Sequence, residues 1–425
     1  MRKTRGLLCV AGSLLLIVTV TGLSFTAFAA NQEGNGATTT KTKVIAEKTP
    51  TPTLNYPSKM YLSLPRNMVP PIRVHAKSWI LVDYNSGQVL TSGNPDERLS
   101  PASLTKVMSY YVVAEALRNG KIKESDKVRI SRKAWKTGGS RMFVKAGDSV
   151  SVKDLLQGMV VQSGNDATVA LAEYVAGSED AFVVLMNRVA QRLGMLQTNF
   201  TNTTGLPHIK GKTTVRDLSI LVRDLIKNYP KEYQLYSQKW FSWSGIKQPN
   251  RNRLLWHFEG ADGVKTGYTK DAGYCLISSA QRDGMRLIAV VMGSKSESAR
   301  VNESQKLLTY GFRFFENRLL YKKDQVIVTP KVWLSATEQV KLGLKENLYL
   351  AVPYGEAKDL TAALTITPYL KAPVLQGQSY GRLVISFKGK TILEKPLVAL
   401  NGAEEGGMWT RVSGRVSLFF HQLFG

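Results

Sequence analysis

The chain has 425 residues, of which 57 are Lys or Arg and 32 are Asp or Glu, and its formal net charge is +25. With only Cys9 and Cys275 it cannot depend on several disulfides, and its length is enough for an ordinary hydrophobic core. The histidines lack the spacing of metal ligands, which disfavours a zinc hydrolase, and no metal site is expected. They are His75, His208, His257 and His421.

The N-terminus has the pattern of an export signal. Three basic residues among the first five precede an apolar run over 7–20, and Ala27-Phe28-Ala29 has small residues where a signal peptidase reads them. Polar and small residues interrupt the run, which disfavours a retained membrane span. Cys9 lies at its start, which disfavours a lipoprotein. We therefore predict a signal peptide over 1–29, whose removal takes away three positive charges and leaves +22.

The strong positive charge of an exported chain suggests acidic surfaces nearby, such as anionic lipid or a carboxylate-rich polymer. Nucleic acid is excluded as a partner, because the chain has an export signal and no recognisable nucleic-acid-binding motif. Residues 30–69 are rich in Thr, Lys, Pro and Gly in their first part and carry little apolar content there. They predict a flexible tether.

Helices and strands alternate irregularly over 70–318, which predicts an α+β domain with helices packed on a largely antiparallel sheet. Strands are expected at 78–83, 88–90, 273–279 and 286–292. Helical spacing runs over 152–159, 166–175, 181–193, 215–226 and 304–315.

One further helix is expected from Ser100, as N-cap, through Pro101 in the first turn to a stop at Gly120. Ser103 then lies in its first turn, with Lys106 three residues on and on the same face. A lysine shielded from water loses its proton more readily and can act as a base for a serine hydroxyl. This segment is a candidate nucleophile site, although Ser-x-x-Lys alone is more often a solvated helix face.

Two other short motifs are candidates. Ser163-Gly164-Asn165 forms a loop between two expected helices and presents a hydroxyl and an amide, which suits a substrate peptide bond. Lys265-Thr266-Gly267 precedes a strand, and an extended segment with a Gly permits close approach of a peptide backbone. Taken singly, each motif is more often a turn or an ordinary strand.

Beyond the first domain the pattern changes. Short β-type runs separated by turn residues cover 319–402 and predict a small β-sandwich without a catalytic constellation, acting as a spacer or interaction module. Over 403–425 the apolar residues fall on one helical stripe that is too interrupted to span a bilayer, after a joint at 404–407. This predicts an amphipathic helix that lies on a membrane surface, the alternative being a terminal helix docked on its own protein.

In combination the three motifs are specific. Ser-x-x-Lys, a Ser-x-Asn triplet and Lys-Thr-Gly follow one another in the order found in class A β-lactamases and penicillin-binding proteins. The chain resembles the low-molecular-mass penicillin-binding proteins of the D-alanyl-D-alanine carboxypeptidase type over nearly everything after the tether. Gly164 is usual in that family, whereas Tyr268 stands where close relatives often carry His. Supporting runs are 138–143, 162–167, 176–182 and 308–316.

The resemblance implies a transpeptidase-type catalytic domain of the penicillin-binding and β-lactamase class, and it implies roles for the motif residues. Ser103 would form an acyl-enzyme, Lys106 would take its proton, and Ser163 would pass a proton to the leaving amine. The remaining residues would bind substrate. Asn165 would bind the donor amide, and Lys265 with Thr266 and Gly267 would bind the peptide and its carboxylate. The backbone N–H groups of Tyr268 and Ser103 would bind the oxyanion, and Arg251 or Arg300 would bind the terminal carboxylate.

The implied activity is removal of the last D-alanine from peptidoglycan stem pentapeptides without a cofactor, at the periplasmic face of the inner membrane. β-Lactam antibiotics would acylate Ser103, and the C-terminal helix would hold anionic lipid. A DD-endopeptidase or transpeptidase sharing the pocket remains open. A β-lactamase is less favoured because no Glu-x-x-Leu-Asn-like run lies between the second and third motifs. A non-catalytic cell-wall-binding protein would lack a catalytic residue, and none is missing.

Overall fold

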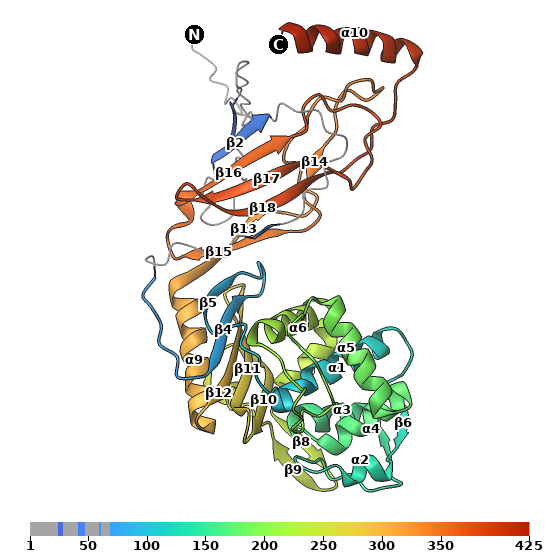
Figure 1. Cartoon of the computed structure of the whole chain (residues 1–425), viewed down its shortest axis with the longest axis vertical. Helices are drawn as coiled ribbons and strands as arrows, with labels where there is room; N and C mark the ends of the chain where they lie inside the picture. Colours follow the sequence, from blue (N-terminus) through green and yellow to red (C-terminus); the bar gives the residue numbers. More distant parts are fainter. Residues whose placement is uncertain (1–23, 29–40, 47–58, 61–68, 425) are drawn as a thin grey trace, which may run out of the picture. The chain divides into compact units, whose positions relative to one another are not determined.

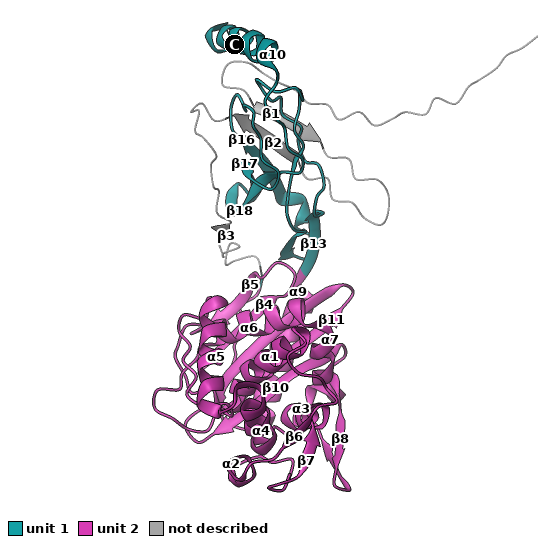
Figure 2. Ribbon diagram, turned by 90° about the vertical axis from the view of Figure 1, so that its right-hand side faces the viewer, with its two compact units in different colours: residues 1–69, 316–425 teal, residues 70–315 magenta. Residues whose placement is uncertain are grey.

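The computed structural model describes residues 24–28, 41–46, 59–60 and 69–424. The chain divides into two compact units, one formed by Pro70–Phe315 and one by Glu316–Gly425 together with Met1–Val69 (Figure 2). The division falls after Phe315, three residues before the end of the domain expected at 318. Each unit has its own hydrophobic core.

A five-stranded antiparallel sheet is the centre of the unit 70–315, with the strand order β10-β11-β12-β4-β5. Its strands are β4 (Ser78–Asp83), β5 (Val89–Gly93), β10 (Ala261–Thr269), β11 (Gly273–Arg282) and β12 (Met285–Ser294). β12 is apolar and buried on both faces because helices cover both of them. The helix α9 (Glu297–Phe314) lies on one face, and α6 (Val215–Asn228) on the other (Figure 1).

The unit has further helices, of which Figure 1 shows α1 to α5 on the α6 side of the sheet. They are η1 (Ala102–Leu104), α1 (Thr105–Arg118), α2 (Arg132–Lys136), α3 (Val152–Val161), α4 (Asn165–Ala176), α5 (Glu179–Arg192), α7 (Pro230–Tyr233), η2 (Gln234–Ser237) and α8 (Leu254–His257). Two antiparallel strand pairs accompany these helices. β6 (Lys127–Arg129) pairs with β7 (Ser149–Ser151), with α2 between them in the chain, and β8 (Trp240–Trp243) forms a hairpin with β9 (Ile246–Pro249).

Side-chain caps define where most of the expected helices begin. Ser151, Ser178, Thr214 and Ser296 each accept a hydrogen bond from the backbone N–H three residues on, which satisfies one of the free donors of a first helical turn. The cap at Ser296 starts α9 seven residues before the helix expected from 304. The α+β fold class is confirmed.

In its described residues the second unit consists mainly of strands, with the short 3-10 helix η3 (Ala357–Asp359) and one final α-helix. A sheet contains β14 (Leu342–Gly343), β16 (Leu360–Ile366), β17 (Ser379–Phe387) and β18 (Lys390–Ala399), and a separate pair joins β13 (Phe315–Tyr321) to β15 (Leu348–Pro353). Both contribute to one core, as a sandwich requires. The runs expected as strands at 326–328 and 332–334 form only isolated bridges.

The predicted signal peptide (1–29) and tether (30–69) lie mostly outside the described residues. The short parts of these segments that are described form strands, whereas a flexible tether would have no regular structure. These strands are β1 (Ser24–Phe28), β2 (Lys41–Ala46) and β3 (Lys59–Met60). β2 pairs parallel with β16 and β3 antiparallel with β18. Backbone N–H and C=O groups along a sheet edge readily accept another strand, which accounts for this addition.

The final helix, α10 (Met408–Phe424), exposes an apolar stripe. The stripe consists of Met408, Trp409, Val412, Val416, Phe419, Phe420 and Leu423. The opposite side contacts the same unit: Leu418 is buried, the His421 ring lies 5.6 Å from the Trp333 ring, and a Cβ at Gly414 would lie 3.1 Å from Leu334. No helix among the described residues is long and apolar enough to cross a membrane.

The joint expected before this helix is held in place. The Ser335 hydroxyl donates to the carbonyl of Glu404 at 2.8 Å, and the N–H of Gly406 donates to the carbonyl of Leu334 at 2.9 Å. Hydrogen bonds to the backbone at both ends of a short link fix its course. In the structure, the joint expected at 404–407 is therefore hydrogen-bonded to the rest of its unit.

Candidate active site

Ser103 lies in the 3-10 turn η1, and Lys106 lies in the first turn of α1 that follows it. The Lys106 Nζ donates to Ser103 Oγ at 3.1 Å and to the carbonyl of Thr204 at 2.8 Å. The lysine is 1% exposed. The second bond holds the amine in place from a segment 98 residues away, so the pair is fixed by tertiary structure.

The start of this helix differs from the sequence prediction. Ser100 makes no capping bond, and the chain enters η1 through Ala102 at φ +46°, a left-handed conformation that costs a non-glycine residue about 1–3 kcal/mol. The Gly205 backbone presses against this residue, and a Cβ at Gly205 would overlap the Ala102 carbonyl oxygen. Packing of a distant loop therefore overrides the local capping signal and turns Ser103 toward the cavity.

Burial lowers the pKa of Lys106 from 10.5 to about 7, because removal from water disfavours the ammonium form. The positive charge of Arg251 lowers this pKa further, and the negative charge of Asp166 opposes the shift. A large fraction of Lys106 is neutral at neutral pH. A neutral amine beside a hydroxyl is the arrangement of an activated serine nucleophile.

Ser163 is the second hydroxyl at the site. It is buried, and among the described residues its Oγ has no hydrogen-bond partner. Its φ is +60°, which places a strained residue immediately before α4. A buried hydroxyl without a partner costs free energy unless a ligand satisfies it. This hydroxyl is therefore open to a ligand.

Asp166, which follows the Ser-Gly-Asn motif, fixes the loop beside the cavity. Its buried carboxylate accepts the backbone N–H groups of Met142 at 3.0 Å, Phe143 at 2.9 Å and Val144 at 3.3 Å. A Cβ at Gly164 would lie 2.9 Å from an Asp166 oxygen, so the glycine leaves room for this arrangement. Asp166 is not among the site residues predicted from the sequence, although its place after the motif was a usable signal.

Asn165 has a supporting position. Its Nδ2 donates to the carbonyl of Gly138 at 2.6 Å, and its backbone N–H donates to the carbonyl of Ser140 at 2.7 Å. Its Oδ1 has no partner among the described residues. Asn165 does not line the cavity, whereas Ser140 does. Asn165 therefore ties the 138–140 loop to the second motif.

The third motif lies on β10, at the edge of the sheet, so one side of this strand is free to pair with an extended ligand. Lys265 is buried and its Nζ donates to the carbonyl of Thr266 at 3.1 Å. Burial and the nearby positive charges of Lys106, Arg251 and Arg300 hold the pKa of Lys265 well below its usual value. An added negative charge would restore its protonated form.

Gly267 lets β10 approach the nucleophile closely. A Cβ at this position would lie 3.2 Å from the Ser103 backbone nitrogen and 3.3 Å from the Ala102 Cβ, tighter than ordinary side-chain contacts. The backbone N–H of Ser103 thus lies next to the strand that carries Thr266 and Tyr268. Two N–H groups near a serine hydroxyl are what an oxyanion site requires.

The two arginines differ in their surroundings. Arg300 is buried, donates to the carbonyl of Gly267 at 3.2 Å, and lies 3.5 Å from Glu297. Arg251 makes no hydrogen bond or ion pair with the described residues, and partial burial lowers its pKa from the usual value. Tyr268 is 53% exposed and packs on the Tyr274 ring at 4.3 Å between ring centroids.

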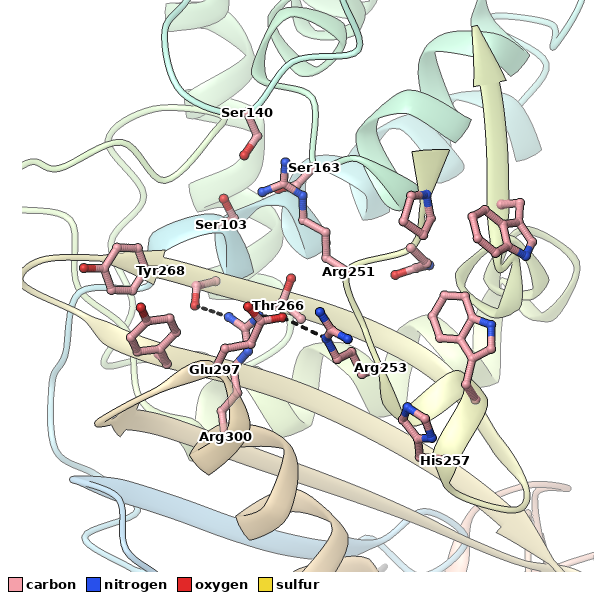
Figure 3. Close-up of a pocket in the computed structure, with 16 residues that line it drawn as sticks. Ser103, Ser140, Ser163, Arg251, Arg253, His257, Thr266, Tyr268, Glu297 and Arg300 are labelled. Carbon is pink, nitrogen blue, oxygen red and sulfur yellow. Dashed lines mark hydrogen bonds and ion pairs between the residues drawn. The ribbon is translucent and has the colours of Figure 1, made fainter. Parts of the chain in front are cut away.

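These elements surround one cavity of about 660 Å³. Figure 3 shows the three serines on one wall, facing Thr266 and Arg300. The lining residues are Ser103, Ser140, Ser163, Trp240, Pro249, Asn250, Arg251, Arg253, Trp256, His257, Thr266, Gly267, Tyr268, Tyr274, Glu297 and Arg300. Lys106 and Lys265 are buried, and the pKa of each reflects shared positive charges around this cavity. No cluster of His, Cys, Asp and Glu suited to a metal occurs in the part of the chain that the structure describes.

The family model of D-alanyl-D-alanine carboxypeptidases matches residues 66–296, and that of the C-terminal domain of penicillin-binding protein 5 matches 315–405. The chain belongs to the D-alanyl-D-alanine carboxypeptidase family. It is 47% identical to the D-alanyl-D-alanine carboxypeptidase DacC of Escherichia coli strain K12 over 83% of this chain and 90% of that protein. It is 42% identical to DacA of the same strain, over 85% and 92%.

Solved structures agree with the family. Penicillin-binding protein 5 from Haemophilus influenzae is 41% identical and superposes with a TM-score of 0.77 over 79% of this chain and all of that one. Penicillin-binding protein D2 from Listeria monocytogenes, in an ampicillin-bound form, is 30% identical with a TM-score of 0.53, over 57% and 99%. The protein is a serine-type D-Ala-D-Ala carboxypeptidase, a hydrolase, as the motif resemblance predicted.

Proposed function

We propose that the protein removes the terminal D-alanine from peptidoglycan stem pentapeptides through an acyl-enzyme on Ser103. The observation that carries this proposal is the Lys106 amine, 3.1 Å from the Ser103 hydroxyl and with a pKa of about 7. In the first step Ser103 Oγ bonds to the carbonyl carbon of the penultimate D-alanine while Lys106 accepts the hydroxyl proton. Water then hydrolyses the ester.

Proton delivery to the leaving amine belongs to Ser163. Its Oγ is buried, faces the cavity and lacks a partner among the described residues, so it is free to bond to the departing nitrogen. When the C–N bond breaks, the amine takes a proton through this hydroxyl and D-alanine leaves. The protonated Lys106 supplies that proton, which restores the neutral base for the hydrolysis of the ester.

Transition-state charge is held by backbone groups. The N–H of Ser103 and the N–H of Tyr268 would donate to the oxyanion of the tetrahedral intermediate, because Gly267 permits close approach of β10 to η1. The free edge of β10 would pair with the substrate backbone. Asn165 contributes by holding the loop that carries Ser140.

The substrate carboxylate would bind at Thr266 and Arg251. Arg251 has no partner among the described residues, whereas Arg300 is engaged with Gly267 and Glu297. A free guanidinium makes a two-pronged hydrogen bond with a carboxylate. Arg300 therefore supports the strand. Burial and neighbouring positive charges lower the pKa of Lys265, and the negative charge of a bound carboxylate would favour its protonated form.

The direct test follows D-alanine release from a diacyl-Lys-D-Ala-D-Ala peptide by the purified chain. We expect release by the wild type and at least a thousandfold loss in Ser103→Ala, in line with removal of a nucleophile that acts as part of a unit. Ser237→Ala, an exposed serine outside the cavity, is the matched control. Activity retained in the Ser103 variant would contradict the assignment.

β-Lactam antibiotics are proposed as covalent inhibitors, because their carboxylate and strained amide mimic the D-alanyl end. Intact mass measurement after penicillin treatment should show one adduct on the wild type and none on Ser103→Ala. If the adduct is hydrolysed as fast as it forms, so that hydrolysed penicillin accumulates, the result would indicate a β-lactamase instead.

We further propose that the chain is exported and lies on the periplasmic face of the bacterial inner membrane through α10. The exposed apolar stripe and the adjoining Arg411 and Arg415 support contact with anionic lipid. Co-flotation with vesicles that contain phosphatidylglycerol should be lost in the paired variant Trp409→Ser and Phe419→Ser. Vesicles of phosphatidylcholine alone provide the charge control. Equal flotation of variant and wild type would exclude α10 as the anchor.

A further inference from the structure

The cavity that contains Ser103 continues beyond the residues proposed to hold the substrate carboxylate. Figure 3 shows Tyr268 on one side of Arg251, and Arg253 with His257 on the other side. A volume of about 660 Å³ lies within the range of about 300–1,000 Å³ typical of pockets for larger ligands. A leaving alanine, with its methyl side chain, would fill little of this second part.

Two tryptophans line this second part of the cavity. Trp240 on β8 and Trp256 on α8 are 46% and 36% exposed, and their rings meet edge to face with 6.0 Å between centroids. The Lys247 ammonium lies 4.9 Å from the centroid of the Trp240 ring. Exposed aromatic pairs offer a large contact area and lose little conformational entropy on binding, so they suit a bulky apolar group.

The tryptophans are held by a scaffold that is tied to the catalytic motifs. The Asn252 side chain is buried and donates to the carbonyl of Gly263 on β10 at 2.8 Å. The Gln162 side chain, next to Ser163, donates to the carbonyl of Pro249 at the end of β9 at 2.8 Å. Buried side-chain bonds of this kind fix the platform relative to the nucleophile without a mobile loop.

Charged side chains lie at the edge of the part of the cavity that the two tryptophans line. Arg253 Nε lies 3.3 Å from Glu297 Oε1, and Arg300 Nη2 lies 3.5 Å from the same oxygen. A ligand with an apolar stem and a polar end would therefore place the stem on the tryptophans and the polar end at this rim. In the proposed binding mode the peptide chain before the scissile bond pairs with the free edge of β10, which leaves the tryptophans to the leaving residue.

We propose, building on the function proposed above, that the Trp240–Trp256 platform binds the side chain of the leaving D-amino acid when that side chain is larger than methyl. The reaction is unchanged: Ser103 Oγ bonds to the D-alanyl carbonyl carbon, the C–N bond breaks, and the amino acid leaves as an amine carrying one more proton. Two substrates share this chemistry, a stem peptide ending in a bulky D-residue and a cross-linked peptide whose leaving group is a diamino acid.

The test compares three substrates with the full chain: diacyl-Lys-D-Ala-D-Ala, diacyl-Lys-D-Ala-D-Phe, and a cross-linked dimer of disaccharide tetrapeptides. The measured quantity is the ratio of kcat/KM for D-Phe release to kcat/KM for D-Ala release. We expect Trp256→Ala and Trp240→Ala each to lower this ratio about tenfold, which corresponds to about 1.4 kcal/mol. Trp135→Ala, an exposed tryptophan on α2 outside the cavity, is the matched control and should leave the ratio unchanged.

An unchanged ratio in both platform variants would overturn the inference. The inference would also be overturned if the wild type releases D-alanine normally but releases D-phenylalanine with less than one hundredth of that kcat/KM. The proposed carboxypeptidase function would then stand. Absence of D-alanine release would instead refute the proposed function. If the wild type cleaves the dimer and Trp256→Ala cleaves it more slowly, the cross-linked peptide is the natural substrate of the platform. If the wild type releases D-Phe but does not cleave the dimer, the natural substrate is a stem peptide that ends in a bulky residue.

Discussion

The pH dependence of acylation tests the role of Lys106 most directly. The base must be neutral to accept the Ser103 proton, and burial lowers its pKa from 10.5 to about 7. The neutral fraction then rises about fiftyfold between pH 5 and pH 7 and only about twofold between pH 7 and pH 9. With its ordinary pKa, only about one lysine in 3,000 would be neutral at pH 7.

The assay is the second-order rate constant for labelling by a fluorescent penicillin, with Ser103→Ala to subtract nonspecific labelling. We expect the rate constant to rise from pH 5, to bend near pH 7 and to be almost level at pH 9. A rate constant that is flat from pH 5 upward, or that keeps rising tenfold per pH unit to pH 9, would refute Lys106 as the base.

Two charge variants provide an internal check, because they act on the same pKa with opposite sign. The positive charge of Arg251 lowers the pKa of Lys106, so Arg251→Gln should move the bend to higher pH. The negative charge of Asp166 raises that pKa, so Asp166→Asn should move the bend to lower pH. Shifts in the same direction would contradict the electrostatic account, even if both variants also reduce the rate.

Two further results are expected from packing. A side chain at Gly267 would push β10 away from the Ser103 N–H. Gly267→Val should therefore lower the penicillin acylation rate constant about a hundredfold, which is the typical effect of losing an oxyanion donor. A loss of less than threefold would argue against this geometry. Asp166→Asn replaces an acceptor of four backbone N–H bonds and should lower the free energy of unfolding by about 2–4 kcal/mol in urea titrations. Exposed Asp271→Asn is the control, and equal effects of the two would refute the role of the buried carboxylate.

The sequence by itself determined the elements and the three motifs. Runs of apolar residues predicted β4 and β12, helical spacing predicted α3 to α6, and the order of the motifs predicted the family. These features are local, because a cap such as Thr214 acts on an N–H only three residues away. The fold class and the activity therefore followed from the sequence alone.

Only the tertiary structure decided the chemistry of the site. Lys106 owes its low pKa to burial and to a charge on Arg251, 145 residues away in the chain, and its orientation to the carbonyl of Thr204. Gly205 displaces the start of α1, which capping rules place at Ser100. Desolvation, Coulomb interaction and close packing depend on which distant groups meet in space, and spacing along the chain does not encode those distances.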